Sequence, residues 1–171
     1  MLSTDHLSIL LTRMLTWRNE AACAATAADL ARRAGLHEAF IELHGTLGAG
    51  KTTFVRHLLH ALGVPGRVKS PTYTVMEPYE VAGANGTLDS PPVPLHIWHF
   101  DFYRFNDPQE WEDAGFRDVF ASTGLKLAEW PEKAEGLLPL PDLRIHIEPG
   151  LVDQREVLIT AHTALGVELL K

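Results

Sequence analysis

Residues 45–52 read GTLGAGKT, and this stretch decides the fold. It fits the pattern GxxxxGK followed by Ser or Thr, in which small residues let successive backbone amides wrap closely around a phosphate group. The apolar run Ala39–His44 precedes it as an expected strand, and Lys51–Leu62 follows with apolar spacing typical of a helix. A helix that begins at such a loop directs its unpaired amides and the positive end of its dipole at the same anion. The sequence therefore predicts a P-loop.

The loop residues are the expected contacts for a nucleotide triphosphate. Lys51 would bring a full positive charge to the β and γ phosphates, which makes it an expected catalytic residue, and Thr52 would offer its hydroxyl to Mg²⁺. The loop residues expected to bind the nucleotide are Thr46, Leu47, Gly48, Ala49, Gly50, Lys51, Thr52 and Thr53. The alternative is a glycine-rich turn that binds no ligand.

A P-loop protein needs a second strand that places a carboxylate near the metal. The apolar segment His96–Arg104, HIWHFDFYR, supplies Asp101, which we expect to hold Mg²⁺ through a water in the manner of a Walker B aspartate. The alternative is an aspartate in a turn at the end of the strand. Phe102 follows Asp101, so the neighbouring glutamate base of many ATPases is absent. Another group must position the attacking water.

The composition is typical of a soluble globular domain. The chain has 171 residues, of which 46% are hydrophobic and 22% charged. We expect one P-loop ATPase domain over residues 1–171, with residues 1–18 as an N-terminal extension and first strand and residues 82–93 as a long loop. The apolar segment Leu7–Leu15 is too short to cross a membrane. The single Cys23 can form no internal disulfide, and we expect a cytoplasmic protein with no membrane contact.

The net charge limits the possible partners. A formal charge of -7 argues against a protein that grips nucleic acid alone, because neutralising phosphates requires clustered Lys and Arg. A histidine metal site is also disfavoured, since His96 and His99 fall on opposite faces of a strand. Cys23 lies in an alanine-rich segment that offers no neighbouring base, which disfavours it as a nucleophile.

The remaining segments predict an α/β fold, a P-loop NTPase-like three-layer sandwich with a central mixed β-sheet flanked by helices. We expect the parallel part of the sheet to carry the P-loop and the later strands to add antiparallel pairs. Asn19 and Asp107 are expected helix caps, with Gly35 and Gly115 as helix ends. The further strands are expected at Leu7–Trp17, Thr72–Val81, Pro94–Arg104, Leu125–Trp130, Leu143–Glu148 and Arg155–Ala161, and further helices at Glu20–Ala34 and from Pro108 to Gly115.

Four motifs together resemble one family. They are GTLGAGKTTFVR at 45–56, VKSPTYTVMEPY at 68–79, HFDFYR at 99–104 and LAEWPE at 127–132. In this order and spacing they resemble the TsaE (YjeE) family of bacterial tRNA-modification ATPases, over a stretch from about Glu20 to Ala161. The GKT triplet alone is unspecific, whereas the four motifs in combination are highly specific. The long loop at 82–93 and the N-terminal extension depart from the family without touching a motif.

The resemblance implies roles for two motifs beyond the loop. The SPTY segment would be a switch-like loop facing the nucleotide, with Ser70, Thr72 and Tyr73 as its counterparts and Thr72 sensing the γ-phosphate. Glu129 would belong to the magnesium site as metal ligand and catalytic residue, and Trp130 would lie near the nucleotide. The alternatives are a solvated charge at a strand end for Glu129 and simple core packing for Trp130.

Two further expectations concern the role of Arg155 and the identity of the cofactor. Arg155 would reach the nucleotide from the last hairpin, with an exposed hairpin arginine as the alternative. The resemblance implies ATP with Mg²⁺, and the sequence carries no guanine-reading NKxD motif.

The resemblance also implies a biological role. The protein would act with TsaB and TsaD in forming threonylcarbamoyladenosine at adenosine 37 of tRNAs that read codons beginning with adenine. It would contact tRNA only indirectly, through that complex. Two alternatives stay open: a small-molecule P-loop kinase, which shares the loop and the metal, and a nucleotide-sensing binding module without useful turnover.

Overall fold

The computed structural model describes residues 8–71, 73–83 and 90–171. Thr72, the expected γ-phosphate sensor, lies outside these residues, as does half of the long loop at 82–93, residues 84–89. The strands are β1 (Leu11–Trp17), β2 (Phe40–His44), β3 (Met76–Val81), β4 (Leu95–Asp101), β5 (Leu125–Glu129), β6 (Leu143–Pro149) and β7 (Arg155–Ala161). The helices are α1 (Glu20–Ala31), α2 (Lys51–Ala61), α3 (Pro108–Asp113), α4 (Phe116–Ala121) and α5 (Ala164–Leu170), with short 3₁₀ helices at Leu36–Glu38 and Pro131–Ala134.

Over the described residues the strands form one mixed sheet in the order β1-β7-β6-β2-β5-β4-β3. The central strands are parallel, since β2 pairs in parallel with both β5 and β6, and β5 in parallel with β4. Antiparallel strands extend both sides, because β3 pairs with β4, β7 with β6 and β1 with β7. The predicted mixed sheet, with antiparallel additions to a parallel centre, is confirmed. Because parallel strands end at one edge, the residues that follow β2, β4 and β5 come close together.

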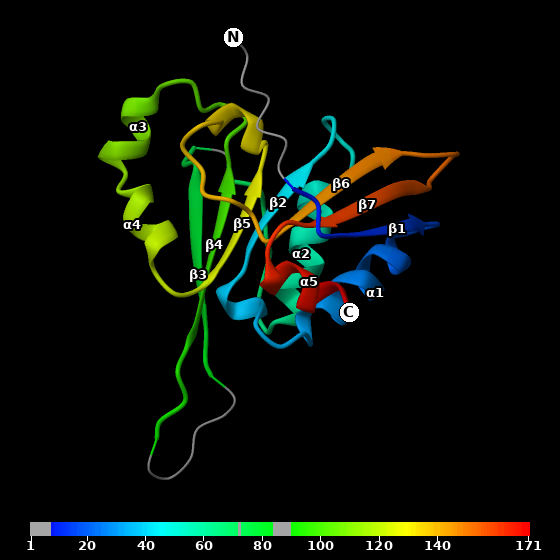
Figure 1. The fold of residues 1–171 in the computed structure, drawn as a ribbon, viewed down its shortest axis with the longest axis horizontal. Coiled ribbons are helices and arrows are strands. Elements are labelled where there is room, and N and C mark those ends of the chain that lie inside the picture. The colour runs from blue at the N-terminus through cyan, green and yellow to red at the C-terminus, as the bar shows by residue number, and fades with distance from the viewer. Residues whose placement is uncertain (1–7, 72, 84–89) are drawn as a thin grey trace.

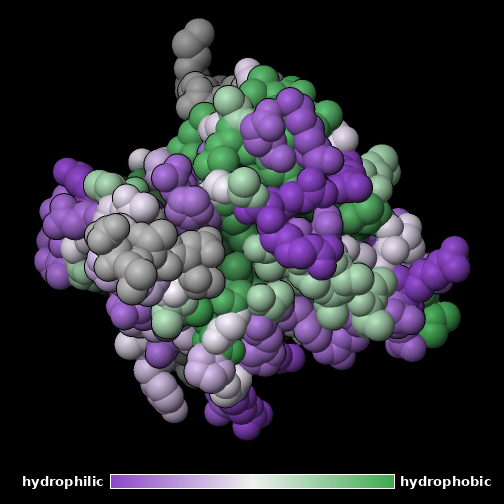
Figure 2. Space-filling view, turned by 90° about the horizontal axis from the view of Figure 1, so that it is seen from below, coloured by the Kyte–Doolittle hydropathy of each residue, from purple (hydrophilic) through white to green (hydrophobic). Residues whose placement is uncertain are grey.

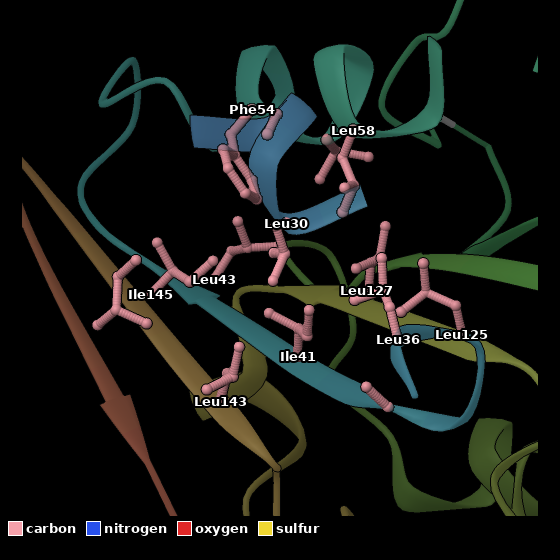
Figure 3. Packing of buried hydrophobic residues seen from close by; sticks show 14 of the residues in the cluster. Leu30, Leu36, Ile41, Leu43, Phe54, Leu58, Leu125, Leu127, Leu143 and Ile145 are labelled. Carbon is pink, nitrogen blue, oxygen red and sulfur yellow. The ribbon is translucent and has the colours of Figure 1, made fainter. Parts of the chain in front are cut away.

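Helices cover the central strands on both faces (Figure 1). α1 and α2 lie on one face, where apolar side chains from the two helices point at those of β2, β5 and β6 (Figure 3). Phe54 and Leu58 of α2 are four residues apart and both fully buried, as the apolar spacing predicts. A second cluster, rich in aromatic rings, packs α3 and α4 against the opposite face of β4 and β5. The layered α/β arrangement places the P-loop at the end of the central strand.

Several element boundaries differ from the prediction. α1 ends at Ala31 instead of Ala34, because the amides of Arg32 and Arg33 bond to carbonyls three residues back and tighten the last turn. Asn19 caps this helix as predicted, since its side chain accepts a 3.0 Å hydrogen bond from the amide of Ala22. β3 begins at Met76 and not at residue 72, and two helices that the sequence pattern did not predict, α4 and α5, are present.

The ends of β4 and β5 also come earlier than predicted. β4 stops at Asp101 because its carboxylate accepts a 3.0 Å hydrogen bond from the amide of Tyr103, which turns the chain. β5 stops at Glu129 because Trp130 adopts a left-handed backbone with φ of 55°. Both turns lie at the sheet edge where the P-loop begins.

None of the described helices has both the length and the apolar character that a bilayer-crossing helix requires. The space-filling view shows hydrophilic side chains interrupting the hydrophobic ones over the face seen from below (Figure 2).

Candidate functional site

The predicted P-loop, GTLGAGKT at 45–52, leads from β2 into α2, in the expected order of strand, loop and helix. Gly48 has a φ of 79° and Gly50, which begins α2, has a φ of 110°. No atom lies within 4 Å of where a Cβ would stand at either glycine, so the backbone conformation and not close packing requires glycine there. The loop therefore keeps open space beside it, which a phosphate-wrapping loop needs.

A pocket of about 290 Å³ lies over the loop and brings together residues from four segments. Most of the predicted site residues contribute to it, although they are up to about 80 positions apart in the sequence. The lining residues are Leu47, Gly48, Ala49, Gly50, Lys51, Thr52, Thr53, Ser70, Asp101, Tyr103, Glu129 and Trp130. Of the predicted loop contacts, Thr46 does not line the pocket but offers its carbonyl to Lys51.

Lys51 is folded back onto its own loop. Its Nζ donates hydrogen bonds to the carbonyl oxygens of Gly45 and Thr46, the latter at 2.9 Å. The same nitrogen lies 4.2 Å from the centroid of the Trp130 ring. Burial lowers the pKa of Lys51, while the nearby carboxylates of Glu129, Glu132 and Asp101 oppose this shift. These carboxylates favour the protonated lysine that a phosphate would require.

Glu129 is anchored by both of its carboxylate oxygens. Oε1 accepts a hydrogen bond of 2.8 Å from the hydroxyl of Thr52, at the start of α2. Oε2 lies 2.7 Å from Nε2 of His99 on β4. The Glu129 side chain is only 2% exposed. The alternative of a solvated charge at the strand end is therefore wrong, because this carboxylate is buried and paired.

Asp101 stands beside Glu129. The two residues are direct partners in the parallel pairing of β4 and β5. The carboxylate of Asp101 accepts hydrogen bonds from the hydroxyl of Ser70 and from the amide of Tyr103. Thr52, Asp101 and Glu129 thus present one hydroxyl and two carboxylates at one place. Hard oxygen donors of this kind are what Mg²⁺ selects, so these residues fit the predicted metal.

Trp130 forms a wall of the pocket. Its left-handed backbone turns the chain directly after Glu129, and its ring packs against Tyr103 with centroids 5.0 Å apart. The ring therefore contacts both an exposed tyrosine and the ammonium group of Lys51. Trp130 is half-buried, and it both lines the pocket and packs against the aromatic cluster beneath α3 and α4, so it combines the predicted position with core packing.

Arg155 reaches the loop from β7. Its Nε donates a 3.0 Å hydrogen bond to the carbonyl of Ala49, and the side chain is partly buried. It therefore lies at the loop and is not an unattached hairpin arginine. Arg155 also lines a second pocket of about 370 Å³, together with Trp17, Asn19, Glu20, Cys23, Ala49, Gly50, Thr53 and Asp153. The two pockets share Ala49, Gly50 and Thr53, so both lie against the same part of the loop.

The switch-like segment is only partly at the site. Ser70 lines the pocket and bonds to Asp101, in agreement with its expected position. Tyr73 is 99% exposed and lines a neighbouring pocket of about 450 Å³ together with Ser70 and Asp101.

Sequence reasoning missed His99 and Tyr103 as parts of the site. A pattern was available for His99, since it stands two residues before Asp101 and strand periodicity places both on one face. The second-pocket residues outside the predicted set gave no such pattern, because β1, α1 and the turn before β7 meet only through the sheet order; they are Trp17, Asn19, Glu20, Cys23 and Asp153.

Comparisons of the sequence with known proteins point to one family. The sequence model of the family described as "Threonylcarbamoyl adenosine biosynthesis protein TsaE" matches residues 17–157. The tRNA threonylcarbamoyladenosine biosynthesis protein TsaE of Haemophilus influenzae is 42% identical over 130 residues, which are 76% of this chain and 75% of that protein. The protein of the same name from Bacillus subtilis is 37% identical over 121 residues, 71% of this chain and 68% of that protein.

A solved structure supports the fold. The crystal structure of YdiB from Bacillus subtilis superposes with a TM-score of 0.70 and 28% sequence identity. The match covers 94% of this chain and 93% of that one. The predicted P-loop NTPase-like α/β fold is thereby confirmed.

Proposed function

Because this chain belongs to the TsaE family and so to threonylcarbamoyladenosine biosynthesis in tRNA, we propose that it is a Mg²⁺-dependent ATPase. In this proposal it acts with TsaB and TsaD in forming the threonylcarbamoyl modification of adenosine 37. It works in the cytoplasm, binds ATP, and touches tRNA only through the complex. Its net charge of -7 supports an indirect contact with tRNA.

The observation that carries the proposal is the convergence of Lys51, Thr52, Asp101 and Glu129 on one pocket beside the loop. Lys51 would exchange its loop carbonyls for phosphate oxygens, which are stronger partners because they carry charge. Thr52, Asp101 and Glu129 would hold Mg²⁺, which when bound neutralises charge on the phosphates. Phe102 is fully buried and cannot act at the site, so Glu129 is the carboxylate that would orient the attacking water.

The second pocket supports a nucleoside triphosphate over a bare phosphate ligand. It begins at the loop residues Ala49, Gly50 and Thr53 and extends away from the two carboxylates. A ribose and base placed there would leave the phosphates at the loop and the terminal phosphate toward Asp101 and Glu129. Arg155 would flank this nucleotide, since its Nε already bonds to the carbonyl of Ala49.

ATP binding and hydrolysis would control when the complex with TsaB and TsaD assembles. ATP binding would favour assembly with TsaB and TsaD, because a ligand stabilises the state that binds it better. Hydrolysis would remove that preference and reset the complex. A binding module without turnover is the alternative, and phosphate release measured with and without the partners separates the two.

A kinase acting on a small molecule is a second candidate because of one observation. The pocket of about 450 Å³ beside Asp101 is lined in part by Tyr73, Tyr103 and Arg104, and it has room for a phosphate acceptor. ADP production stimulated by a metabolite would favour a kinase. Stimulation by TsaB and TsaD would favour the tRNA-modification role.

The decisive experiment reconstitutes the modification with purified TsaB, TsaD, tRNA, ATP and the threonylcarbamoyl donor. We expect Lys51→Ala to abolish the ATP-dependent yield of threonylcarbamoyladenosine, measured by mass spectrometry of digested tRNA. The matched control is Lys171→Ala, because this lysine is 63% exposed and pairs only with Glu168 among the described contacts. Normal modification by Lys51→Ala would refute the proposal.

A further inference from the structure

We infer that His99 is a positioning residue for Glu129, holding one carboxylate oxygen from beneath so that the other oxygen faces the nucleotide site. The effect that we expect on ATP hydrolysis rests on the proposed function. Its geometry and its first test do not depend on turnover.

The two oxygens of Glu129 have different surroundings. Oε2 is 2.7 Å from Nε2 of His99, whose side chain is 0% exposed. Oε1 accepts from the hydroxyl of Thr52, which opens onto the pocket over the loop. The core-facing bond is therefore shielded from water, while the site-facing bond is made to a residue that Mg²⁺ would engage. A ligand that recruits Thr52 releases Oε1, while Oε2 stays held by His99.

The sheet explains why His99 lies beneath the site and not in it. His99 and Asp101 are two residues apart on β4, so they point to the same face. In the parallel pairing with β5, Asp101 lies opposite Glu129, and His99 lies one step deeper, opposite Leu127. His99 lines none of the pockets at the loop. It therefore acts through Glu129 and does not touch the nucleotide.

Hydrogen-bond chemistry determines which nitrogen carries the proton. An ionised carboxylate only accepts, so Nε2 of His99 must be the donor in this pair. Nδ1 is buried and has no hydrogen-bond partner among the described residues. A buried acceptor without a partner is better tolerated than a buried N–H without one. Nε2 of His99 therefore donates its proton to Oε2 of Glu129.

Removing this donor would leave a buried carboxylate oxygen unpaired. Glu129 would then swing toward water or toward Lys51, whose pKa already responds to its charge. Partners that orient a metal-ligating side chain are typically worth about 10- to 100-fold in metal affinity or activity. The effect should appear in the metal-dependent part of nucleotide binding, because His99 does not touch the nucleotide itself.

The first test is ¹⁵N NMR of the histidine rings in the protein without metal or nucleotide. We expect the resonances of His99, assigned by comparison with His99→Gln, to show a protonated Nε2. A proton on Nδ1 with Nε2 bare would overturn the inference. This readout holds whether or not the protein hydrolyses ATP.

The second test compares three variants by titration with a fluorescent ADP analogue, in Mg²⁺ and in EDTA. His99→Leu removes the donor, His99→Gln restores an amide near the position of Nε2, and His99→Asn carries an amide too short to reach Glu129. We expect His99→Leu and His99→Asn to lose ~10-fold or more of the Mg²⁺-dependent gain in affinity. Their affinity in EDTA should be unchanged, and His99→Gln should recover most of the gain.

Turnover should follow the same ranking, with kcat reduced and KM little changed in His99→Asn. If His99→Leu fails to fold, the comparison of His99→Gln with His99→Asn still tests the inference, because the two side chains carry the same amide and differ only in length. Equal Mg²⁺ dependence in Gln and Asn would overturn the inference while leaving the proposed ATPase intact. If the unaltered protein hydrolyses no ATP even with TsaB and TsaD, the proposed function fails. The NMR and ADP-binding measurements still test the role of His99 in that case, because neither requires hydrolysis.

Discussion

The ammonium nitrogen of Lys51 lies 4.2 Å from the centroid of the Trp130 ring. It also donates a hydrogen bond of 2.9 Å to the carbonyl of Thr46. Both contacts keep the lysine against the loop that it would serve, and a phosphate that binds there would draw the ammonium group away from them. A cation at this distance interacts with the face of an indole ring, so its movement should change the environment of Trp130.

Nucleotide binding should therefore change the fluorescence of Trp130. We expect titration with Mg-ADP to alter the tryptophan emission of the unaltered protein, and Trp130→Phe to remove most of that change. The matched control is Trp98→Phe, because Trp98 packs against His96 and Lys126 away from the loop. If Trp130→Phe keeps the full response, the contact between Lys51 and Trp130 does not report on the site.

Thr52 should carry much of the metal dependence of nucleotide binding. Thr52→Val keeps the shape of the side chain but removes the hydroxyl that bonds to Glu129. We expect the affinity for ADP in Mg²⁺ to fall about tenfold, toward its value in EDTA, because a hydrogen bond or ligand to a charged group is lost. Calorimetric titration with ADP, in Mg²⁺ and in EDTA, measures this change in affinity.

The companion variant Thr52→Ser retains the hydroxyl and should bind nearly as the unaltered protein does. If Thr52→Val keeps the full gain in ADP affinity that Mg²⁺ gives the unaltered protein, Thr52 is excluded as a metal ligand.

Gly45 should tolerate no larger residue. Its φ is 148°, and a Cβ there would lie 2.4 Å from the carbonyl oxygen of Ile147 on β6. We expect Gly45→Ala to lower the free energy of unfolding by about 2 to 4 kcal/mol, because backbone strain and a clash with main chain add together. Urea unfolding followed by circular dichroism measures the loss.

Gly48→Ala is the matched control for this loop. Its φ of 79° is also unfavourable for alanine, but its Cβ would meet no atom within 4 Å. We expect a smaller loss of about 1 to 2 kcal/mol, from the backbone alone. Equal losses in the two variants would show that the approach of Ile147 does not matter.

Cys23 should react slowly in the folded protein. Burial, with a smaller contribution from the charge of Glu20, raises the pKa of its thiol from 9.0 to about 12. At pH 8 the thiolate should be about a thousandfold rarer than in an unfolded chain, because each unit of pKa changes it tenfold. Iodoacetamide labelling followed by mass spectrometry should therefore be slow in buffer and fast in urea.

The same shift predicts the pH dependence of stability. Because the folded-state pKa of Cys23 is raised, its contribution is present below about pH 9 and is lost as the pH rises toward about 12. Cys23→Ala should flatten that part of the stability curve. Rapid labelling of the folded protein would contradict the burial of this thiol.

Local patterns in the sequence determined the loop and the elements around it. GTLGAGKT predicts a P-loop because its small residues and its lysine act within eight consecutive positions, and the flanking β2 and α2 follow from apolar spacing. Asp101 was predicted for the same reason, since it ends an apolar strand, whereas Glu129 was assigned from the resemblance of its LAEWPE motif to the TsaE family. The charge and the single Cys23 likewise needed no structure.

Only the tertiary structure decided how these pieces meet. His99 lies against Glu129, and Arg155 bonds to Ala49, 106 positions before it, because β4 pairs with β5 and β7 lies beyond β6. Strand order and register depend on many side chains packing at once, and no single segment contains that information. The sequence by itself specified the chemistry of the site, and long-range packing of the sheet selected which groups hold that chemistry in place.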